Sequence, residues 1–211
     1  MAYLLSYNFA MAFGWLAVVY AAVLALVIGV PPQEVYDQVG CATTPVAYLL
    51  AVSFMEVFHA ATGLVKGGPV EAFLQCAGRA IMYFGVAMQQ PASQSTVMYP
   101  ILLVAWGLSE CIRYPFYLAQ TMNNCPRGLM WLRYSAFVVL YPVGFFAEVA
   151  VVLPGFWLME NKLGLPAVIP FATNSQIVMG LYLAWAYLVG APRLYFHMLR
   201  RRAAKLRPKT E

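Results

Sequence analysis

A tyrosine and a glutamate stand seven residues apart in one long apolar segment, residues 131–153. Seven residues make almost two helical turns, so Tyr141 and Glu148 lie on one face of the helix that this segment predicts. Pro142, between them, cannot donate to the carbonyl of Val138 and disturbs the preceding turn. A phenol and a carboxyl placed in this way can act as a general acid and a general base. The alternative is structural: Glu148 pairs with an arginine of a neighbouring helix, and Pro142 only kinks its own helix.

The segment that carries this pair is long enough to span a bilayer, which takes about 20 apolar residues. A carboxylate inside such a span costs about 2.5–3.5 kcal/mol on insertion scales, which makes Glu148 a functional candidate. The whole chain has the same character: of 211 residues, 63 % are apolar and 10 % are charged, and the mean hydropathy is +0.70. A soluble domain carries roughly 25 % charged residues, so the composition predicts an integral membrane protein of one domain.

Six apolar segments predict an all-α bundle of six transmembrane helices that takes up the whole chain, residues 1–211. The third segment is the weakest, because Gln75 and Arg79 interrupt it. A basic tail, residues 197–211, follows the last segment. The six predicted spans cover about residues 10–30, 45–65, 72–88, 97–118, 131–153 and 175–196.

The basic residues outside these spans indicate which side of the membrane each loop faces. Lys66, Arg127 and Arg133 lie on the same side as the tail, whose last twelve residues hold four Arg and two Lys. The loops on the other side have one basic residue, Lys162, which is offset by Glu160. Because cytosolic loops carry the excess of Lys and Arg, this distribution predicts that both termini are cytosolic.

Three arginines lie in the cytosolic half of this predicted bundle: Arg79, Arg113 and Arg133. Guanidinium groups favour bidentate contact with phosphate and carboxylate, so these residues suit an anionic ligand that arrives from the cytosol. The alternative is ion pairing within the bundle. The expected partners are then Glu110, one turn before Arg113, and Glu56 in the second span.

The sequence does not predict a metal site. Glu56 and His59 stand three residues apart on one helical face, but the only other histidine, His197, lies at the cytosolic end of the sixth span. The four cysteines show no CxxC spacing. His59 is better suited to orient a neighbouring side chain across the bundle.

Five stretches contain most of these polar residues in a fixed order along the chain. They are YLLSYNFAMAFGW at 3–15, MEVFHAATGLVKG at 55–67, LQCAGR at 74–79, AWGLSECIRYPFYL at 105–118 and WLRYSAFVVLYPVGFFAE at 131–148. In their order and spacing they resemble the very-long-chain 3-hydroxyacyl-CoA dehydratases of fatty-acid elongation, also called protein-tyrosine-phosphatase-like membrane proteins. The family's third-helix motif has a serine before its arginine, where this chain has Gly78.

The resemblance implies a reaction, the loss of water from a (3R)-3-hydroxyacyl-CoA to give a trans-2-enoyl-CoA, the third step of the elongation cycle. The family's catalytic Tyr and Glu fall on Tyr141 and Glu148. Either Glu148 protonates the leaving hydroxyl while Tyr141, helped by an arginine, takes the α-proton, or the roles are reversed, or a water is shared. The family's supporting polar positions fall on Glu56, Gln75, Arg79, Arg113 and Arg133.

The resemblance also implies surroundings for this reaction. Dehydration moves no electrons, so no metal or redox cofactor is required. We expect the cytosolic arginines to hold the CoA phosphates, and the acyl chain to lie among the apolar helices. The elongation system implies the endoplasmic reticulum membrane, with the condensing enzyme and the two reductases as partners and no nucleic acid.

The sequence also bears on two other classes of function. Phosphatase activity is not supported, because no cysteine is followed six positions later by the arginine of a CX5R loop. A non-catalytic membrane protein is the competing class, either a scaffold for the elongation enzymes or a small transporter. A transporter predicts polar residues that reach both faces of the membrane, whereas here they thin out beyond Glu148.

Overall fold

The computed structural model describes residues 1–40, 45–65, 67–163 and 186–206, and every regular element in these ranges is helical. The predicted all-α class is therefore confirmed. Short π-helical segments, labelled η, lie between some of the α-helices. The elements are α1 (Ala2–Ile28), α2 (Pro32–Val35), η1 (Tyr36–Gly40), α3 (Pro45–Ser53), α4 (Met55–Ala61), α5 (Pro69–Ala80), η2 (Ile81–Ala87), α6 (Pro91–Gln94), α7 (Met98–Thr121), α8 (Arg127–Ser135), α9 (Phe137–Leu163), η3 (Ala186–Gly190) and α11 (Ala191–Leu206).

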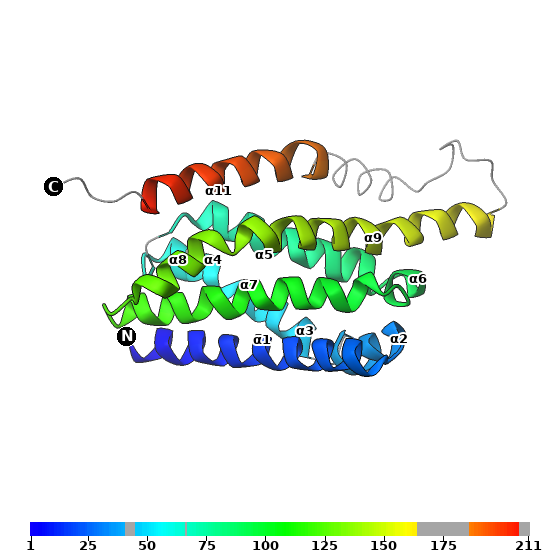
Figure 1. Ribbon diagram of the computed structural model, residues 1–211, viewed down its shortest axis with the longest axis horizontal. Coiled ribbons are helices and arrows are strands. Elements are labelled where there is room, and N and C mark those ends of the chain that lie inside the picture. The colour runs from blue at the N-terminus through cyan, green and yellow to red at the C-terminus, as the bar shows by residue number, and fades with distance from the viewer. Residues whose placement is uncertain (41–44, 66, 164–185, 207–211) are drawn as a thin grey trace.

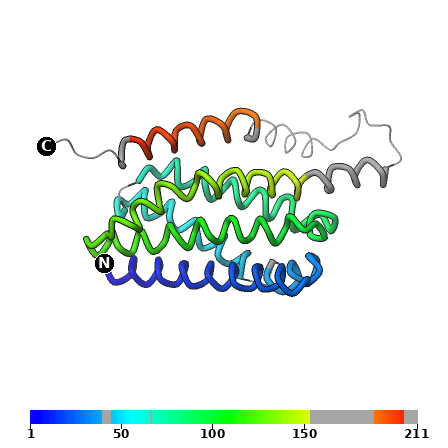
Figure 2. The backbone as a smooth tube through the Cα atoms, viewed as in Figure 1, coloured from blue at the N-terminus to red at the C-terminus, as the bar shows by residue number. Residues whose placement is uncertain are grey.

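The long helices lie side by side and alternate in direction, with α7 in the middle (Figure 1). α7 packs most extensively against α1 on one side and against α9 on the other. α11 lies beyond α9, and α4 packs against α5 behind this layer. The backbone trace shows the start of α1 and the end of α11 at the same end of the molecule (Figure 2).

Small residues let α7 occupy this middle position. A Cβ atom added at Gly107 of α7 would lie 2.3 Å from Val19 Cγ2 of α1, so the absence of a side chain permits the observed approach. On the other side, a Cβ at Gly144 of α9 would lie 3.7 Å from Ala105 Cβ of α7. Small residues at such contacts are typical of helices that pack in membranes.

The first two predicted spans differ in detail from the helices. α1 begins at Ala2 and not near residue 10, because no proline or glycine interrupts the first ten residues. The second span is divided at Phe54 into α3 and α4. α4 ends at Ala61, just before Gly63, whose φ of +73° is unfavourable for residues with a side chain.

The fifth predicted span is also divided. α8 ends at Ser135 and α9 begins at Phe137, so the break lies just upstream of Pro142. α9 then continues to Leu163, past the expected end at residue 153, although Pro154 lies within it. A proline removes one backbone hydrogen bond, and the rest of the helix can continue around it.

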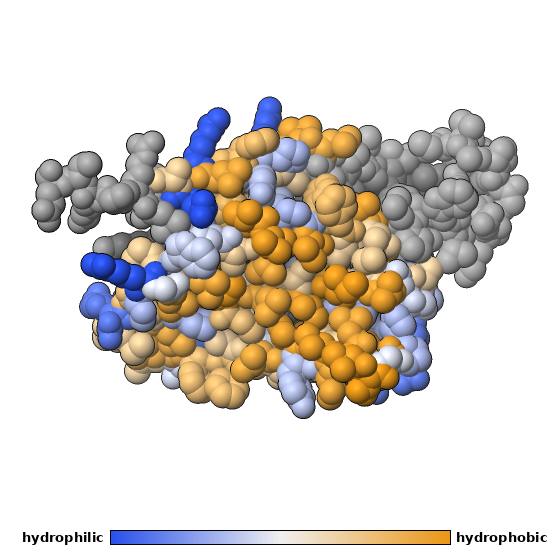
Figure 3. All heavy atoms as spheres, in the orientation of Figure 1, coloured by the Kyte–Doolittle hydropathy of each residue, from blue (hydrophilic) through white to orange (hydrophobic). Residues whose placement is uncertain are grey.

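Two stretches of the described chain are long and apolar enough to cross a membrane, Ala2–Ile28 and Arg127–Val152. A shorter apolar stretch covers Pro45–Ala61. Half of the sixth predicted span cannot be compared, because residues 175–185 lie outside the described ranges. Apolar side chains cover the middle of the visible face and polar ones gather toward its ends (Figure 3). The number of membrane crossings stays a prediction.

Candidate active site

Two oppositely charged side chains are buried on α7. Glu110 is 1 % exposed and Arg113 is 4 % exposed, and Glu110 Oε2 lies 2.7 Å from Arg113 Nη2. Their spacing of three residues places them one turn apart on the same face of the helix. The ion pair expected between them from the sequence is therefore confirmed.

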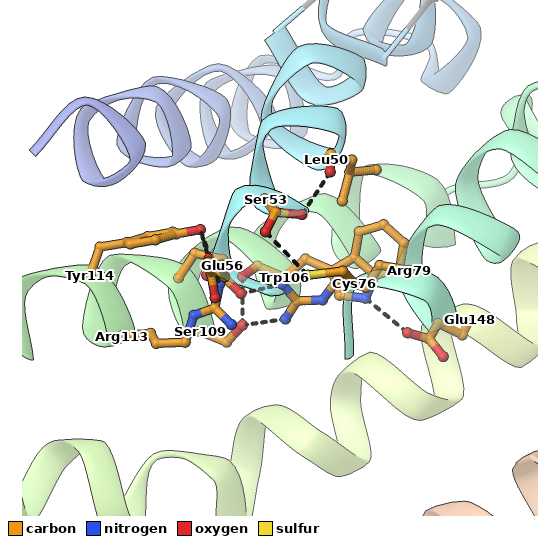
Figure 4. A network of polar contacts seen from close by, with 11 residues as sticks. Leu50, Ser53, Glu56, Cys76, Arg79, Trp106, Ser109, Arg113, Tyr114 and Glu148 are labelled. Atoms are coloured by element: carbon orange, nitrogen blue, oxygen red, sulfur yellow. Dashed lines mark hydrogen bonds and ion pairs between the residues drawn. The ribbon is translucent and has the colours of Figure 1, made fainter. Parts of the chain in front are cut away.

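Neighbouring helices complete an alternating network of charges (Figure 4). Glu56 of α4 accepts from Arg113 Nη2 at 2.6 Å, and the Tyr114 hydroxyl also donates to Glu56. Arg79 of α5 pairs with Glu110. Two carboxylates thus face two guanidinium groups, which offsets the cost of burying each charge. For Arg79 and Arg113 the structure shows the ion-pairing alternative.

A small cavity lies beside this network, with a volume of about 10 Å³. Its lining includes Ser53, Cys76 and the exposed side chain of Gln75. This is room for about one water molecule. Gln75 therefore lies next to the charged network and makes no ion pair or hydrogen bond among the described residues.

Arg133 of α8 differs from the other two arginines. Its side chain is half-buried, and it makes no ion pair with a carboxylate in the described ranges. It still contributes to the positive field at Glu110. Of the three arginines expected to bind an anion, Arg133 is the one whose charge is not matched by a contacting carboxylate.

Glu148 is connected to α7 through a tryptophan. Trp106 Nε1 donates to Glu148 Oε1 at 2.8 Å. The guanidinium carbon of Arg79 lies 5.7 Å from the centre of the Trp106 ring, within cation–π range. The charged network therefore extends across α7 to the candidate carboxylate on α9, as Figure 4 shows.

Tyr141 is held by a different helix. Its half-buried hydroxyl donates to the backbone carbonyl of Ala191, at the start of α11, over 2.9 Å, and its ring packs on Tyr195. Glu148 and Tyr141 act on each other electrostatically, but each makes its hydrogen bond to a separate neighbour. The pair shares one face of α9 and lies between α7 and α11.

His59 has a structural position near the start of α1. It is 2 % exposed, and its Nε2 lies 2.9 Å from the Tyr3 hydroxyl. The rings of Tyr3 and Tyr7 pack edge-on against it. This arrangement fits the expectation of a buried polar group that orients its neighbours.

The sequence did not single out Trp106, Ser109 or Tyr114 as parts of this site. Ser109 accepts from Arg79 Nη2 at 2.9 Å, and Tyr114 holds Glu56. A signal for two of them was present, because Trp106 and Tyr114 stand four residues before and after Glu110 and so share its face of α7.

Comparison with known protein families identifies one that matches the chain. The model of a family described as protein tyrosine phosphatase-like protein, PTPLA, matches residues 50–208, about three quarters of the chain. The chain belongs to the PTPLA family. The family recognised from the five stretches is therefore confirmed. The region that the family model covers begins within α3, so α1, α2 and η1 precede it.

Curated members of the PTPLA family match over almost the full chain. The "Very-long-chain (3R)-3-hydroxyacyl-CoA dehydratase PASTICCINO 2B" of Oryza sativa subsp. japonica is 34 % identical, over 97 % of this chain and 92 % of its own. The dehydratase hpo-8 of Caenorhabditis elegans is 30 % identical, over 95 % and 92 %. The human very-long-chain (3R)-3-hydroxyacyl-CoA dehydratase 2 is 27 % identical, over 95 % and 79 %. No solved structure matches the chain.

Proposed function

We propose that this protein removes water from a (3R)-3-hydroxyacyl-CoA to form a trans-2-enoyl-CoA, the third step of very-long-chain fatty-acid elongation. The observation that carries the proposal is that relatives from plants, a nematode and mammals, aligned over at least 95 % of the chain, all have the name of this dehydratase. The residues that the chemistry needs are present, because Tyr141 and Glu148 share one face of α9.

The reaction needs one base and one acid. The base takes a proton from C2, and the electrons of that C–H bond form the C2–C3 double bond. The C3–O bond breaks at the adjacent carbon and its electrons leave with the oxygen, which the acid protonates so that it departs as water. Tyr141 and Glu148 can supply both functions without a change of oxidation state.

Within this proposal we assign Glu148 as the base and Tyr141 as the acid, because one hydrogen bond of each side chain fits that role. The indole nitrogen of Trp106 can only donate, so Glu148 Oε1 acts as an acceptor, which suits a carboxylate that takes a proton. The Tyr141 hydroxyl donates to a backbone carbonyl, which suits a neutral phenol that keeps its proton until the substrate binds. In the complex the hydroxyl would exchange the Ala191 carbonyl for the substrate oxygen.

The remaining polar residues have supporting roles in this proposal. Arg133 is best placed to meet a CoA phosphate, since it forms no ion pair with a carboxylate in the part of the chain that the structure describes. Glu56 and Arg113 hold α4 against α7, and Gln75 borders the cavity beside them. The acyl chain would lie among the apolar helices.

The setting of the reaction belongs to the same proposal. We place the chain in the endoplasmic reticulum membrane with six spans and both termini in the cytosol. The two long apolar helices and the common end of α1 and α11 support this topology. The condensing enzyme and the two reductases of the cycle are the proposed partners, because they produce its substrate and use its product.

Turnover by the purified protein in detergent tests the proposal. We expect (3R)-3-hydroxyacyl-CoA of at least one chain length to be dehydrated, and Tyr141→Phe and Glu148→Gln each to lose about 100-fold or more in kcat. Tyr20→Phe and Glu71→Gln are matched controls, because both side chains are exposed, and they should keep wild-type turnover.

Each failure has a distinct meaning. A wild-type protein that is inactive at every chain length would refute the dehydratase and favour a scaffold in the elongation complex. Activity that survives in both α9 variants would keep the dehydratase and refute the assignment of its chemistry to Tyr141 and Glu148.

A further inference from the structure

Trp106 contacts both the charged network and Glu148. It is 4 % exposed and lies on α7 one turn before Glu110. One edge of its ring donates to Glu148 on α9, and Arg79 of α5 lies over its face. The indole therefore connects three helices at the point where the candidate carboxylate is held.

Arg79 is fixed against the same turn of α7 by several contacts. Its guanidinium pairs with Glu110 and donates to Ser109 Oγ at 2.9 Å. The Ser109 hydroxyl in turn donates to the backbone carbonyl of Trp106 at 2.7 Å. Arg79 thus touches the Trp106 ring directly and its backbone through Ser109, so it restricts both the place and the tilt of the indole.

We propose that Trp106 is a positioning residue for Glu148, and that Arg79 acts on the reaction through Trp106 and not by binding the phosphates of the substrate. The inference rests on the proposed function, because it assigns how one of its two catalytic side chains is aimed. It also changes the role expected for Arg79, which the sequence grouped with the phosphate-binding arginines.

The physical argument concerns the freedom of a glutamate. A carboxyl on two methylene groups can rotate about several bonds, and a base must be held within a fraction of an ångström of the proton that it takes. The indole N–H of Trp106 cannot accept a proton, and its hydrogen bond holds Oε1 of Glu148 in place. The cation above the ring keeps the donor itself in place.

Trp106→Phe is the first test, because phenylalanine keeps an aromatic face for Arg79 and removes the N–H. We expect kcat to fall about 10- to 100-fold while KM changes less than about twofold, since misplacement of a reacting group acts on the chemical step. Trp15→Phe is the matched control: Trp15 is 1 % exposed and its Nε1 has no partner among the described residues. It should keep kcat within about threefold.

A double-mutant cycle tests the route from Arg79. Arg79→Lys keeps the charge but loses the planar contact with the ring. If Arg79 acts through the indole N–H, adding Arg79→Lys to Trp106→Phe should lower kcat by less than about twofold beyond Trp106→Phe alone. Losses that multiply would show that the two residues act independently and would overturn the inference.

A second substrate separates positioning from phosphate binding. A 3-hydroxyacyl-pantetheine thioester lacks the nucleotide phosphates of CoA, so an arginine that binds those phosphates would matter less for it. We expect Arg79→Lys to cost the same factor in kcat on both thioesters. A defect confined to KM for the CoA substrate would refute the inference and restore Arg79 as a phosphate ligand.

These experiments separate a wrong role for Trp106 from a wrong assignment of the reaction itself. An inactive wild-type protein would refute the dehydratase itself. An active wild-type protein whose Trp106→Phe variant keeps its kcat, in a folded state judged by its melting temperature, would leave the dehydratase standing and remove Trp106 from it.

Discussion

At the scale of single residues, Glu110 shows what the buried charges do. Its carboxylate is 1 % exposed and contacts both Arg79 and Arg113. Removing one partner from a buried ionic network leaves the other charges uncompensated, which costs about 3–5 kcal/mol. We therefore expect Glu110→Gln to lower the free energy of unfolding by about that amount, measured by denaturation in mixed micelles.

The exposed Glu71 provides the control for this prediction, because Glu71→Gln makes the same chemical change on the surface of α5. It should alter the free energy of unfolding by less than about 0.5 kcal/mol. Equal effects of the two variants would mean that the buried pairs contribute no more than solvated ones.

Single residues also show which contacts could be predicted from the sequence and which could not. The spacing along one helix predicted the pair of Glu110 and Arg113, and the structure contains it. The contact of Trp106 with Glu148 joins two helices, so no spacing within either one predicts it. Residue types and helical periodicity identify which residues share one face of a helix. Contacts between helices depend on how the helices are arranged in space, which the sequence of either helix does not specify.

At the scale of the helices, the approach of α1 to α7 depends on Gly107. A Cβ at Gly107 would lie 2.3 Å from Val19 Cγ2, so any side chain at this position would force α1, α7 or the Val19 side chain to move. Overpacking of this kind costs about 1–3 kcal/mol. We expect Gly107→Ala to lower the melting temperature of the purified protein in detergent.

The same substitution at Gly78 of α5 should have the opposite sign. A Cβ at Gly78 would contact nothing within 4 Å, and alanine is favoured over glycine inside a helix by about 0.5–1 kcal/mol. Gly78→Ala should therefore raise the melting temperature. A rise in both variants would show that α1 can move away from α7 without cost.

Helix existence was easier to predict than helix ends. The apolar segments predicted where the helices lie, because hydrophobic runs are visible in the sequence. The break at Phe54 and the continuation of α9 to Leu163 were not predicted. Both are decided by backbone hydrogen bonds and by packing against other helices, which composition does not specify.

At the scale of the whole molecule, the two ends differ in the chain segments that they expose. The turn between α7 and α8 lies at the same end as the start of α1, and α6 lies at the other end (Figure 1). Cysteine labelling in intact microsomes tests this arrangement, in a background variant with Cys41 and Cys125 changed to serine. We expect a membrane-impermeant maleimide to label Asn124→Cys, between α7 and α8, and to leave Gln89→Cys, before α6, unlabelled. Both positions are exposed, and detergent should make both react.

The reverse pattern of labelling would place the termini in the lumen, and equal labelling before detergent would contradict a spanning topology. The charge distribution predicted the orientation, but the order of the helices around the bundle was not predictable from the sequence. That order depends on which surfaces fit one another, and the close pairing of α1 with α7 gives one instance.

The pairing of α1 with α7 also has a consequence in time. At about 5–20 residues per second, the stretch between these two helices takes roughly 3–14 s to synthesise. A helix whose backbone hydrogen bonds are internal can persist in lipid, so during that interval α1 would wait without the contact between Val19 and Gly107. The arrival of Gly107 closes this contact before Tyr141 and Glu148 have been made. Slower translation of the intervening segment therefore lengthens the exposure of an unfinished bundle to cellular quality control, at a stage when the candidate active site does not yet exist.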